Sequence, residues 1–238
     1  MVNRQKIIIL FLVIIMARPV YAQQGDFELG GGLSYNTVGL DKLNHHLWQR
    51  NQYLNYDLFS NYTYQPLENI ESEVGYFLTG RYWLTDNLAL GGEIEQTYLF
   101  SYYHNFRYLE SYELELTGFL GVLNYRIDME RSDLDLKLAV GPYSSLFDWN
   151  KHIKTDMKDV TSERYEGNTL GAKIGADFFF PMTTQVEGRI GVNYRYAFFS
   201  KLEDEEGQPF YSVYGDDMAG DQFDFSGLEM RSSLEIKF

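Results

Sequence analysis

The sequence contains no cysteine, has few basic residues and, after residue 22, has no apolar run near the ~20 residues of a membrane-spanning helix. Without cysteine, a chain of 238 residues must be stable without disulfides. The shortage of basic residues argues against nucleic acid as a partner and against docking on an anionic membrane surface, because both require a basic face. If the mature chain is integral to a membrane, it must cross as a β-barrel.

The N-terminus is typical of a secretory signal peptide. Arg4 and Lys6 precede an apolar run over residues 7–17, and a small-residue end, Val20-Tyr21-Ala22, follows. The run is too short to cross a bilayer. We therefore expect residues 1–22 to be cleaved and residues 23–238 to form one barrel domain. That domain has 17 basic and 34 acidic residues, a net charge of −17.

Alternation of apolar and polar residues with a period of two recurs along the mature chain and predicts antiparallel strands. The expected strands cover residues 27–35, 71–84, 88–98, 112–122, 134–140, 170–180, 186–198 and 227–238. Three of the connections between them are short (85–87, 129–132 and 181–184), and four are long (36–70, 100–110, 148–166 and 200–224). Short and long connections alternate, as expected of an all-β, eight-stranded, up-and-down transmembrane barrel with short periplasmic turns and long extracellular loops.

The last strand ends the chain at Phe238. An unpaired strand at that place would leave an open hydrogen-bonding edge, so we expect it to close the barrel against the first strand. A soluble barrel of the lipocalin type has the same alternation with its faces exchanged. Strands of 12–15 residues, tyrosines near the ends of the apolar stripes, and glycines interleaved with charges of both signs favour the membrane barrel.

If the apolar sides face lipid, the polar sides fill a narrow lumen. The expected lumen network consists of Arg81, Glu93, Glu95, Glu113, Glu115, Lys173, Asp177, Arg189, Arg195, Glu229 and Arg231. Pairing Phe180 with Val186 would place Asp177 opposite Arg189, which predicts an interior ion pair. Three aromatic residues fall on the nominally inward side, where they either plug the lumen or mark a change of parity: Phe77, Trp83 and Phe119.

The signal peptide, eight strands, loop asymmetry and terminal Leu234-Glu-Ile-Lys-Phe238 together resemble the small Gram-negative outer-membrane β-barrels of the OmpA, OmpX and OmpW kind. This resemblance covers the mature chain and lies in its pattern. It implies an outer-membrane location, contact with lipid and lipopolysaccharide, and Phe238 as part of the signal read by the barrel-insertion machinery. It implies no particular activity.

Enzyme motifs are missing from the sequence. The four histidines, His45, His46, His104 and His152, fall in expected loops without the His-x-Ser spacing of a lipid A deacylase. No set of ligands has the spacing of a metal site, so we expect no catalysis, cofactor or resident metal. The acidic loop 201–224 is either a solvated loop or a site for divalent cations shared with lipopolysaccharide.

The first long loop carries leucines with helical spacing at Leu40, Leu43 and Leu47, followed by Trp48. We expect a short amphipathic helix that lids the barrel, lies at the headgroup boundary, presents a binding surface, or packs on the other loops. The leading functional hypothesis is a filled barrel with a structural or surface-interaction role. The alternatives are an OmpW-like binder or conduit for a small hydrophobic molecule, and a soluble exported ligand-binding barrel.

Overall fold

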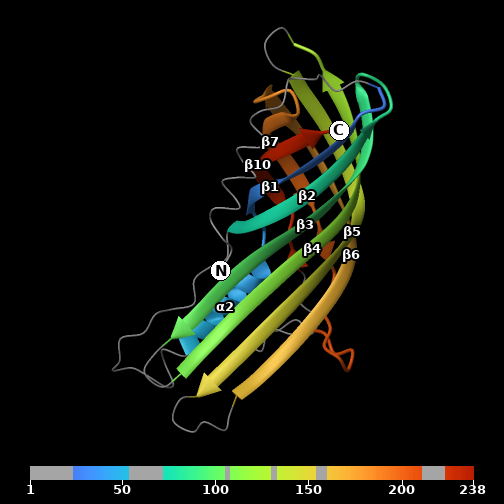
Figure 1. The fold of residues 1–238 in the computed structure, drawn as a ribbon. Helices are drawn as coiled ribbons and strands as arrows, with labels where there is room; N and C mark the ends of the chain where they lie inside the picture. The colour runs from blue at the N-terminus through green and yellow to red at the C-terminus, as the bar shows by residue number, and fades with distance from the viewer. Residues whose placement is uncertain (1–23, 54–71, 105–107, 130–132, 154–159, 211–222) are drawn as a thin grey trace.

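The computed structural model describes residues 24–53, 72–104, 108–129, 133–153, 160–210 and 223–238. Within them, eight antiparallel strands close into one barrel in the order β1-β10-β7-β6-β5-β4-β3-β2 (Figure 1). The strands are β1 Phe27–Thr37, β2 Ser72–Trp83, β3 Leu88–His104, β4 Tyr108–Ile127, β5 Asp133–Ile153, β6 Val160–Pro181, β7 Val186–Tyr196 and β10 Gly227–Lys237. Outside this sheet lie the helix α2 (Asp41–Tyr53) and a small two-stranded sheet of β8 (Phe198–Phe199) and β9 (Phe223–Asp224). The predicted eight-stranded up-and-down barrel is confirmed, whereas the predicted signal peptide lies outside the described residues.

The last strand closes the barrel against the first, as the sequence predicts. β10 pairs antiparallel with β1 from Glu28 opposite Lys237 to Asn36 opposite Glu229. The backbone N–H of Phe238 then donates to the carbonyl of Phe27 at 2.8 Å, so the pairing continues to the last residue. A strand can end this chain because both of its edges are satisfied by neighbours.

Four strands are much longer than the other four. β3 to β6 contain 17, 20, 21 and 22 residues, whereas β1, β2, β7 and β10 contain 11 or 12. A bilayer crossing uses only about 9–11 residues, so β3–β6 continue beyond the membrane as a four-stranded sheet. Figure 1 shows this extension at the end of the barrel where α2 lies. Much of the predicted loops 100–110 and 148–166 is therefore strand, which places His104 in β3 and His152 in β5.

The outward-facing side chains form an apolar band around the barrel. On β5, Leu136, Leu138 and Val140 are 43%, 47% and 53% exposed, and beyond Pro142 the outward positions become polar with Ser144 and Asp148. A continuous band of exposed apolar side chains on every strand is unfavourable in water. Lipid hydrocarbon around the barrel would cover it. The predicted orientation, with the apolar stripes towards lipid, is therefore confirmed for this band. No helix in the described ranges has the length and apolar character needed to span a membrane.

Exposed aromatic residues gather at both margins of the band, where interfacial girdles are expected. Near the short turns these residues are Phe27, Tyr82, Tyr125, Phe178 and Phe180. At the opposite margin they are Tyr35, Tyr76, Tyr98, Tyr194 and Tyr196. The two rows mark the limits of the hydrocarbon, and the longer strands and α2 lie on the extracellular side.

The expected facing of the β4 side chains, with Tyr112, Leu114 and Leu116 towards lipid, is wrong. Tyr112, Leu114 and Leu116 point inward and are fully buried, whereas Glu113 faces outward and Glu115 is partly exposed on the same side. This part of β4 lies beyond the membrane, where water replaces lipid outside the sheet. A strand there follows the soluble pattern, with its apolar side inward. The lipid-facing residues of β4 include Phe119 and Leu123, on the side that the alternation predicts to face the lumen.

An apolar core fills the inside of the extracellular sheet. Leu40, Leu43 and Leu47 are buried in one cluster with aromatic residues of β4, β5 and the segment between β7 and β10. Its aromatic members are Tyr112, Tyr143, Phe147, Trp149, Phe199, Phe210, Phe223 and Phe225. The predicted helix is confirmed as α2, and of the roles considered for it, two are seen together: it packs on the segment between β7 and β10, and it covers this end of the barrel.

The floor of this core is Tyr143 on β5. A Cβ added at Gly118 on β4 or at Gly171 on β6 would lie 2.6 or 2.5 Å from atoms of the Tyr143 ring. The ring therefore lies flat across both neighbouring strands, and only glycine leaves room for it. Tyr143 lies between the aromatic core above and the charged lumen below, where Glu95 and Arg195 are among the charged groups that interact with its hydroxyl.

Candidate functional site

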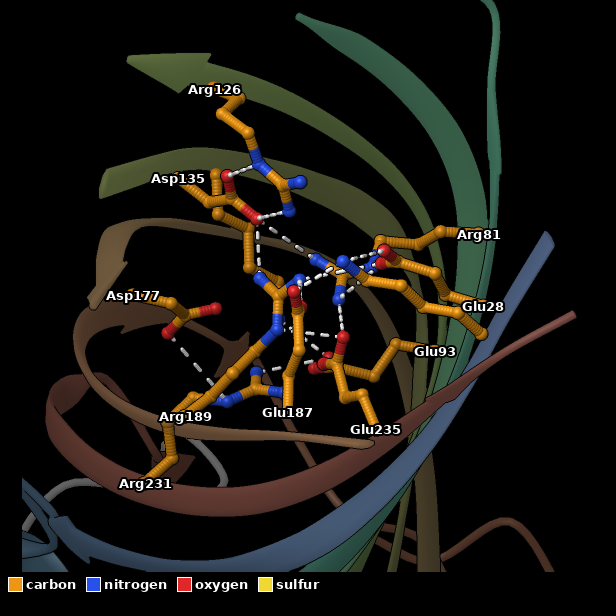
Figure 2. Close-up of polar contacts among 12 residues, drawn as sticks. Glu28, Arg81, Glu93, Arg126, Asp135, Asp177, Glu187, Arg189, Arg231 and Glu235 are labelled. Carbon is orange, nitrogen blue, oxygen red and sulfur yellow. Dashed lines mark hydrogen bonds and ion pairs between the residues drawn. The ribbon is translucent and has the colours of Figure 1, made fainter. Parts of the chain in front are cut away.

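The candidate site is the network of charged side chains inside the membrane-spanning part of the barrel. At the end near the short turns, the network is centred on Asp135 of β5, which is completely buried. Arg126 of β4 donates from Nε to Asp135 Oδ1 at 2.9 Å and from Nη2 to Oδ2 at 3.2 Å. Arg189 of β7 donates to Asp135 Oδ2, and Arg81 Nη1 of β2 lies 3.5 Å from the same oxygen (Figure 2). One carboxylate therefore links three arginines from three strands.

Arg189 connects Asp135 to the carboxylates of the closing strands. Its Nε lies 2.7 Å from Glu235 Oε2, and its Nη2 lies 3.3 Å from Glu28 Oε2 and 3.4 Å from Glu187 Oε2. Arg81 contacts Glu235 and also lies 3.3 Å from Glu28 Oε2. Figure 2 shows the two guanidinium groups between these carboxylates. The seam between β1 and β10 is therefore held by ion pairs as well as by the backbone ladder.

The charges at this end balance. Four carboxylates face four cations, namely Glu28, Asp135, Glu187 and Glu235 against Arg81, Arg126, Arg189 and Lys237. Oxygens of Glu28, Glu187 and Glu235 all lie within 4.8 Å of one another, the arrangement most like a metal site among the described residues. Lys237 contacts Glu187 and lies 4.0 Å from Glu28 Oε1. The protein's own cations therefore occupy the positions from which a metal would be bound.

Aromatic rings complete the inner end of the lumen. The guanidinium carbon of Arg126 lies 4.0 Å from the ring centroid of Trp83 and 4.0 Å from that of Phe179, so Arg126 is sandwiched between them. Further along the lumen, Arg231 lies 3.6 Å over the ring of Phe77. Of the three aromatics with uncertain facing, Phe77 and Trp83 plug the lumen, whereas Phe119 faces lipid.

A second cluster fills the middle of the lumen around Glu93 of β3. Lys137 Nζ donates to Glu93 Oε2 at 2.5 Å, and Arg231 Nη1 donates to the same oxygen at 2.9 Å. Lys173 of β6 lies 2.6 Å from Glu229 Oε2 and 3.5 Å from Glu93 Oε1. These contacts cross the lumen from β6 to β10 and to β3.

Further towards the extracellular end, Lys173 also contacts Glu95. Arg195 of β7 bonds to Glu73 of β2, and its Nη1 lies 3.9 Å from Glu95 Oε1. Ion pairs therefore continue from the short-turn rim to the level of Tyr143. Nine of the eleven expected lumen residues lie inside, namely Arg81, Glu93, Glu95, Lys173, Asp177, Arg189, Arg195, Glu229 and Arg231.

The other two expected lumen residues, Glu113 and Glu115, are corrected to the outer surface because of the parity of β4. Lumen residues absent from the expected set are Glu28, Glu73, Arg126, Asp135, Lys137, Glu187, Glu235 and Lys237. All except Arg126 lie on the polar sides of strands whose facing was predicted correctly, so alternation alone could have found them. Arg126 lies on β4, where the inverted parity hid it.

The predicted pair of Asp177 and Arg189 does not form. Phe180 pairs with Gly188, and Asp177 therefore lies opposite Gly191, with Arg231 Nε 3.9 Å from its Oδ1. The turn sets this register, because the N–H groups of Met182 and Thr183 both donate to the carbonyl of Val186, at 2.9 and 3.0 Å. The register is two residues from the expected one, which leaves every side chain on its predicted face.

Outside the membrane, the ion pair of Arg164 and Asp148 repeats the geometry of the buried Arg126–Asp135 pair. Arg164 donates from Nε and Nη2 to the two carboxylate oxygens at 2.7 and 2.9 Å. These hydrogen bonds raise the pKa of Arg164 above its ordinary value. Burial raises the pKa of Tyr165 on the same strand, and a hydrogen bond from its hydroxyl to Glu163 acts in the same direction.

No protein-family model and no curated protein sequence matches this chain. Among solved structures, it is similar to Ail, the attachment invasion locus protein of Yersinia pestis, in complex with the heparin analogue sucrose octasulfate. That likeness has a TM-score of 0.53 at 15% identity and covers 90% of this chain and 99% of Ail. The protein has the fold of the small outer-membrane β-barrels.

Two further similar structures have lower TM-scores. OprG of Pseudomonas aeruginosa gives 0.45 at 11% identity, covering 91% of this chain and 97% of that one. The outer-membrane protease OmpT of Escherichia coli gives 0.48 at 8% identity, covering 92% and 98%. The barrel fold and the exposed apolar band together place this protein in the outer membrane.

Proposed function

We propose that this protein is a closed outer-membrane barrel that holds a folded sheet at the cell surface for interaction with other molecules, without catalysis or conduction. The observation that carries the proposal is the double filling of the lumen. Ion pairs occupy the membrane-spanning part, and an apolar core capped by α2 occupies the extracellular part. An eight-stranded barrel has room inside for side chains but not also for a wide aqueous path.

The charged lumen residues act as cross-links between strands. Glu93 is shared by Lys137, Lys173 and Arg231, and Asp135 by three arginines, so each carboxylate is already surrounded by cations. A general base or nucleophile needs a free face towards a substrate. The proposal of no catalysis is supported by this mutual saturation and by the lack of catalytic spacing among the histidines.

Single-channel recording in planar bilayers tests the closed barrel. Purified full-length protein, folded as shown by heat-modifiable mobility in gels, is expected to insert without giving a stable large conductance. A stable pore formed by the monomer would contradict the proposal. Tyr143→Ala is the matched variant, since it removes the floor between the two halves of the lumen and is expected to produce conductance above wild type.

The described part of the extracellular surface is unlike a polyanion site. Among the described, non-buried residues at the extracellular ends of β4–β6 and in 200–210 and 223–224, ten are acidic and three are basic: Glu113, Glu115, Asp148, Glu163, Glu166, Glu203, Asp204, Glu205, Glu206 and Asp224 against Lys151, Arg164 and Lys201. Sulfated ligands of the kind bound to Ail would be repelled. We expect no retention of this protein on a heparin column at physiological salt, and retention would count against the electrostatic reasoning.

Lipopolysaccharide and the insertion machinery remain the expected partners of the barrel itself. Phe238 is exposed at the short-turn rim, with its backbone paired to Phe27. The aromatic side chain is therefore dispensable for the ladder and free to serve as a signal. Phe238→Ser is expected to lower the yield of inserted barrel in cells while leaving refolding into detergent unchanged.

A second candidate function, binding of a small hydrophobic molecule, is favoured by one feature of the wall. An apolar groove of about 880 Å³ runs across the outside of β1–β4, beside Leu78, Ile94 and Phe119. Its floor includes Gly92, where an added Cβ would meet nothing closer than 3.7 Å. If this groove holds the ligand, Gly92→Leu should abolish binding of a fluorescent fatty acid by the protein in detergent. Unchanged binding would exclude the groove.

A further inference from the structure

The outer face of the extracellular sheet carries carboxylates directly opposite one another. Glu113 on β4 pairs across to Asp148 on β5, and Glu166 on β6 pairs across to Glu203 through an isolated bridge. Like charges in directly opposed positions destabilise a sheet. Arg164 neutralises Asp148, whereas the side chain of Glu113 forms no hydrogen bond or ion pair within the described residues. The face therefore keeps an excess of negative charge that the fold itself does not use.

This face lies clear of the hydrocarbon. Glu113 is six positions before Phe119, the outermost lipid-facing residue on β4. At a rise of about 3.4 Å per residue and a strand tilt of about 40°, Glu113 lies about 15 Å above that level. Asp148 lies the same number of residues beyond Pro142. Both carboxylates are therefore in the aqueous layer outside the membrane.

Exposed aromatic side chains flank these carboxylates on β3. Phe100 lies directly opposite Glu113 in the ladder and is 58% exposed. The Phe100 ring centroid lies 5.4 Å from that of Tyr102, and Tyr98 is opposite Glu115. Because Phe100 shares its row with Glu113, the interfacial girdle does not explain its exposure.

A hollow separates the aromatic and acidic stripes. Its volume is about 210 Å³, and it is lined by Tyr98, Phe100, Glu113, Glu115, Leu146 and Asp148. Aromatic faces attract cations, and carboxylates form charge-assisted hydrogen bonds with ammonium and guanidinium groups. The hollow therefore offers an alkyl or π surface on one side and anionic acceptors on the other.

We propose that this outer face of β3–β5, defined by Tyr98, Phe100, Glu113, Glu115 and Asp148, is the docking surface for a basic polypeptide. Lysine or arginine side chains enter the hollow between Phe100 and Glu113, and their charge pairs with the Glu113 carboxylate, because Arg164 already neutralises Asp148. The proposal rests on the surface-interaction function, to which it assigns a face and a partner chemistry. Complementary charge also speeds association, so binding weakens as salt screens it.

Fluorescence anisotropy with the full-length protein in nanodiscs tests the docking surface. The probe is a fluorescein-labelled nona-lysine peptide, titrated at low salt. Glu113→Gln and Phe100→Ala are each expected to weaken binding at least fivefold. The matched controls are Glu206→Gln, which removes the same charge from an exposed turn outside this face, and Phe119→Ala, which removes the same ring from the lipid-facing wall. Both controls are expected to bind like wild type.

Three results would overturn the docking surface: no peptide binding by wild type, an equal loss in Glu206→Gln, or unchanged binding by correctly folded Glu113→Gln and Phe100→Ala. Displacement of the peptide by equimolar spermine would overturn the polypeptide as partner in favour of a small polyamine. Single-channel recording of the same protein preparations in planar bilayers keeps the two proposals separate. A conducting barrel that binds the peptide would refute closure alone, whereas a closed barrel that does not bind it would refute the docking surface alone.

Discussion

Asp135→Asn removes the carboxylate at the centre of the inner lumen while keeping its shape. Asp135 is fully buried and accepts hydrogen bonds from Arg126 and Arg189, with Arg81 at 3.5 Å. The substitution leaves three buried arginines short of one counter-charge. Breaking a buried ion pair from one side typically costs about 3–5 kcal/mol, because the remaining charge stays desolvated. We expect a loss of that size in the free energy of unfolding.

The same strand supplies the control. Asp148 also holds an arginine through Nε and Nη2, but its side chain is 20% exposed and that of Arg164 is 55% exposed. Exposed ion pairs contribute about 0–1 kcal/mol, so Asp148→Asn should change stability by no more than that. Unfolding by urea from lipid vesicles, followed by tryptophan fluorescence, measures both variants. Equal losses in the two would refute the reasoning that the lumen pairs are desolvated.

Other substitutions test the packing of the extracellular half. Gly171→Ala should lower the stability and the yield of folded barrel, because the added Cβ would lie 2.5 Å from the Tyr143 ring. Gly92→Ala should be tolerated, because its Cβ would have its nearest neighbour at 3.7 Å. Heat-modifiable gel mobility measures the folded fraction of both variants. Leu47→Ala should cost about 2–5 kcal/mol of local stability and speed hydrogen exchange in α2, because Leu47 is fully buried. Trp48→Ala, at an exposed position of the same helix, should leave that exchange unchanged, and equal effects would contradict the burial of only one face.

The sequence pattern was sufficient for the strand number, the closure of the barrel and the facing of most strands. Those features depend on alternation, which changes little when a register slips by two residues. The Asp177–Arg189 pair failed for this reason, since the turn at Met182–Val186 sets a register that alternation cannot distinguish. Each lumen residue was on the predicted side of its strand wherever that strand's facing was right.

The error at β4 has a different origin. Alternation shows which side of a strand is apolar. Whether that side faces outward or inward depends on whether lipid or water surrounds the sheet. Below Phe119 the medium is lipid, and above it the medium is water, so Leu114 points inward and Glu113 outward. The sequence offered one cue to this change, the unexpected position of Phe119. A second indication is strand length, because β3–β6 are longer than a bilayer crossing and include residues 100–104, 108–110, 148–153 and 160–166.

Site-directed spin labelling along β4 and β5 tests most directly the claim that lipid covers the lower outer wall and water the upper. The chain has no cysteine, so single cysteines can be introduced without background. Labels at Phe119 and Leu138 should be accessible to oxygen dissolved in the bilayer, labels at Glu113 and Asp148 to a water-soluble nickel complex, and labels at Leu114 and Ala139 to neither. Oxygen accessibility at Ala139 with none at Leu138 would contradict the orientation of the barrel wall.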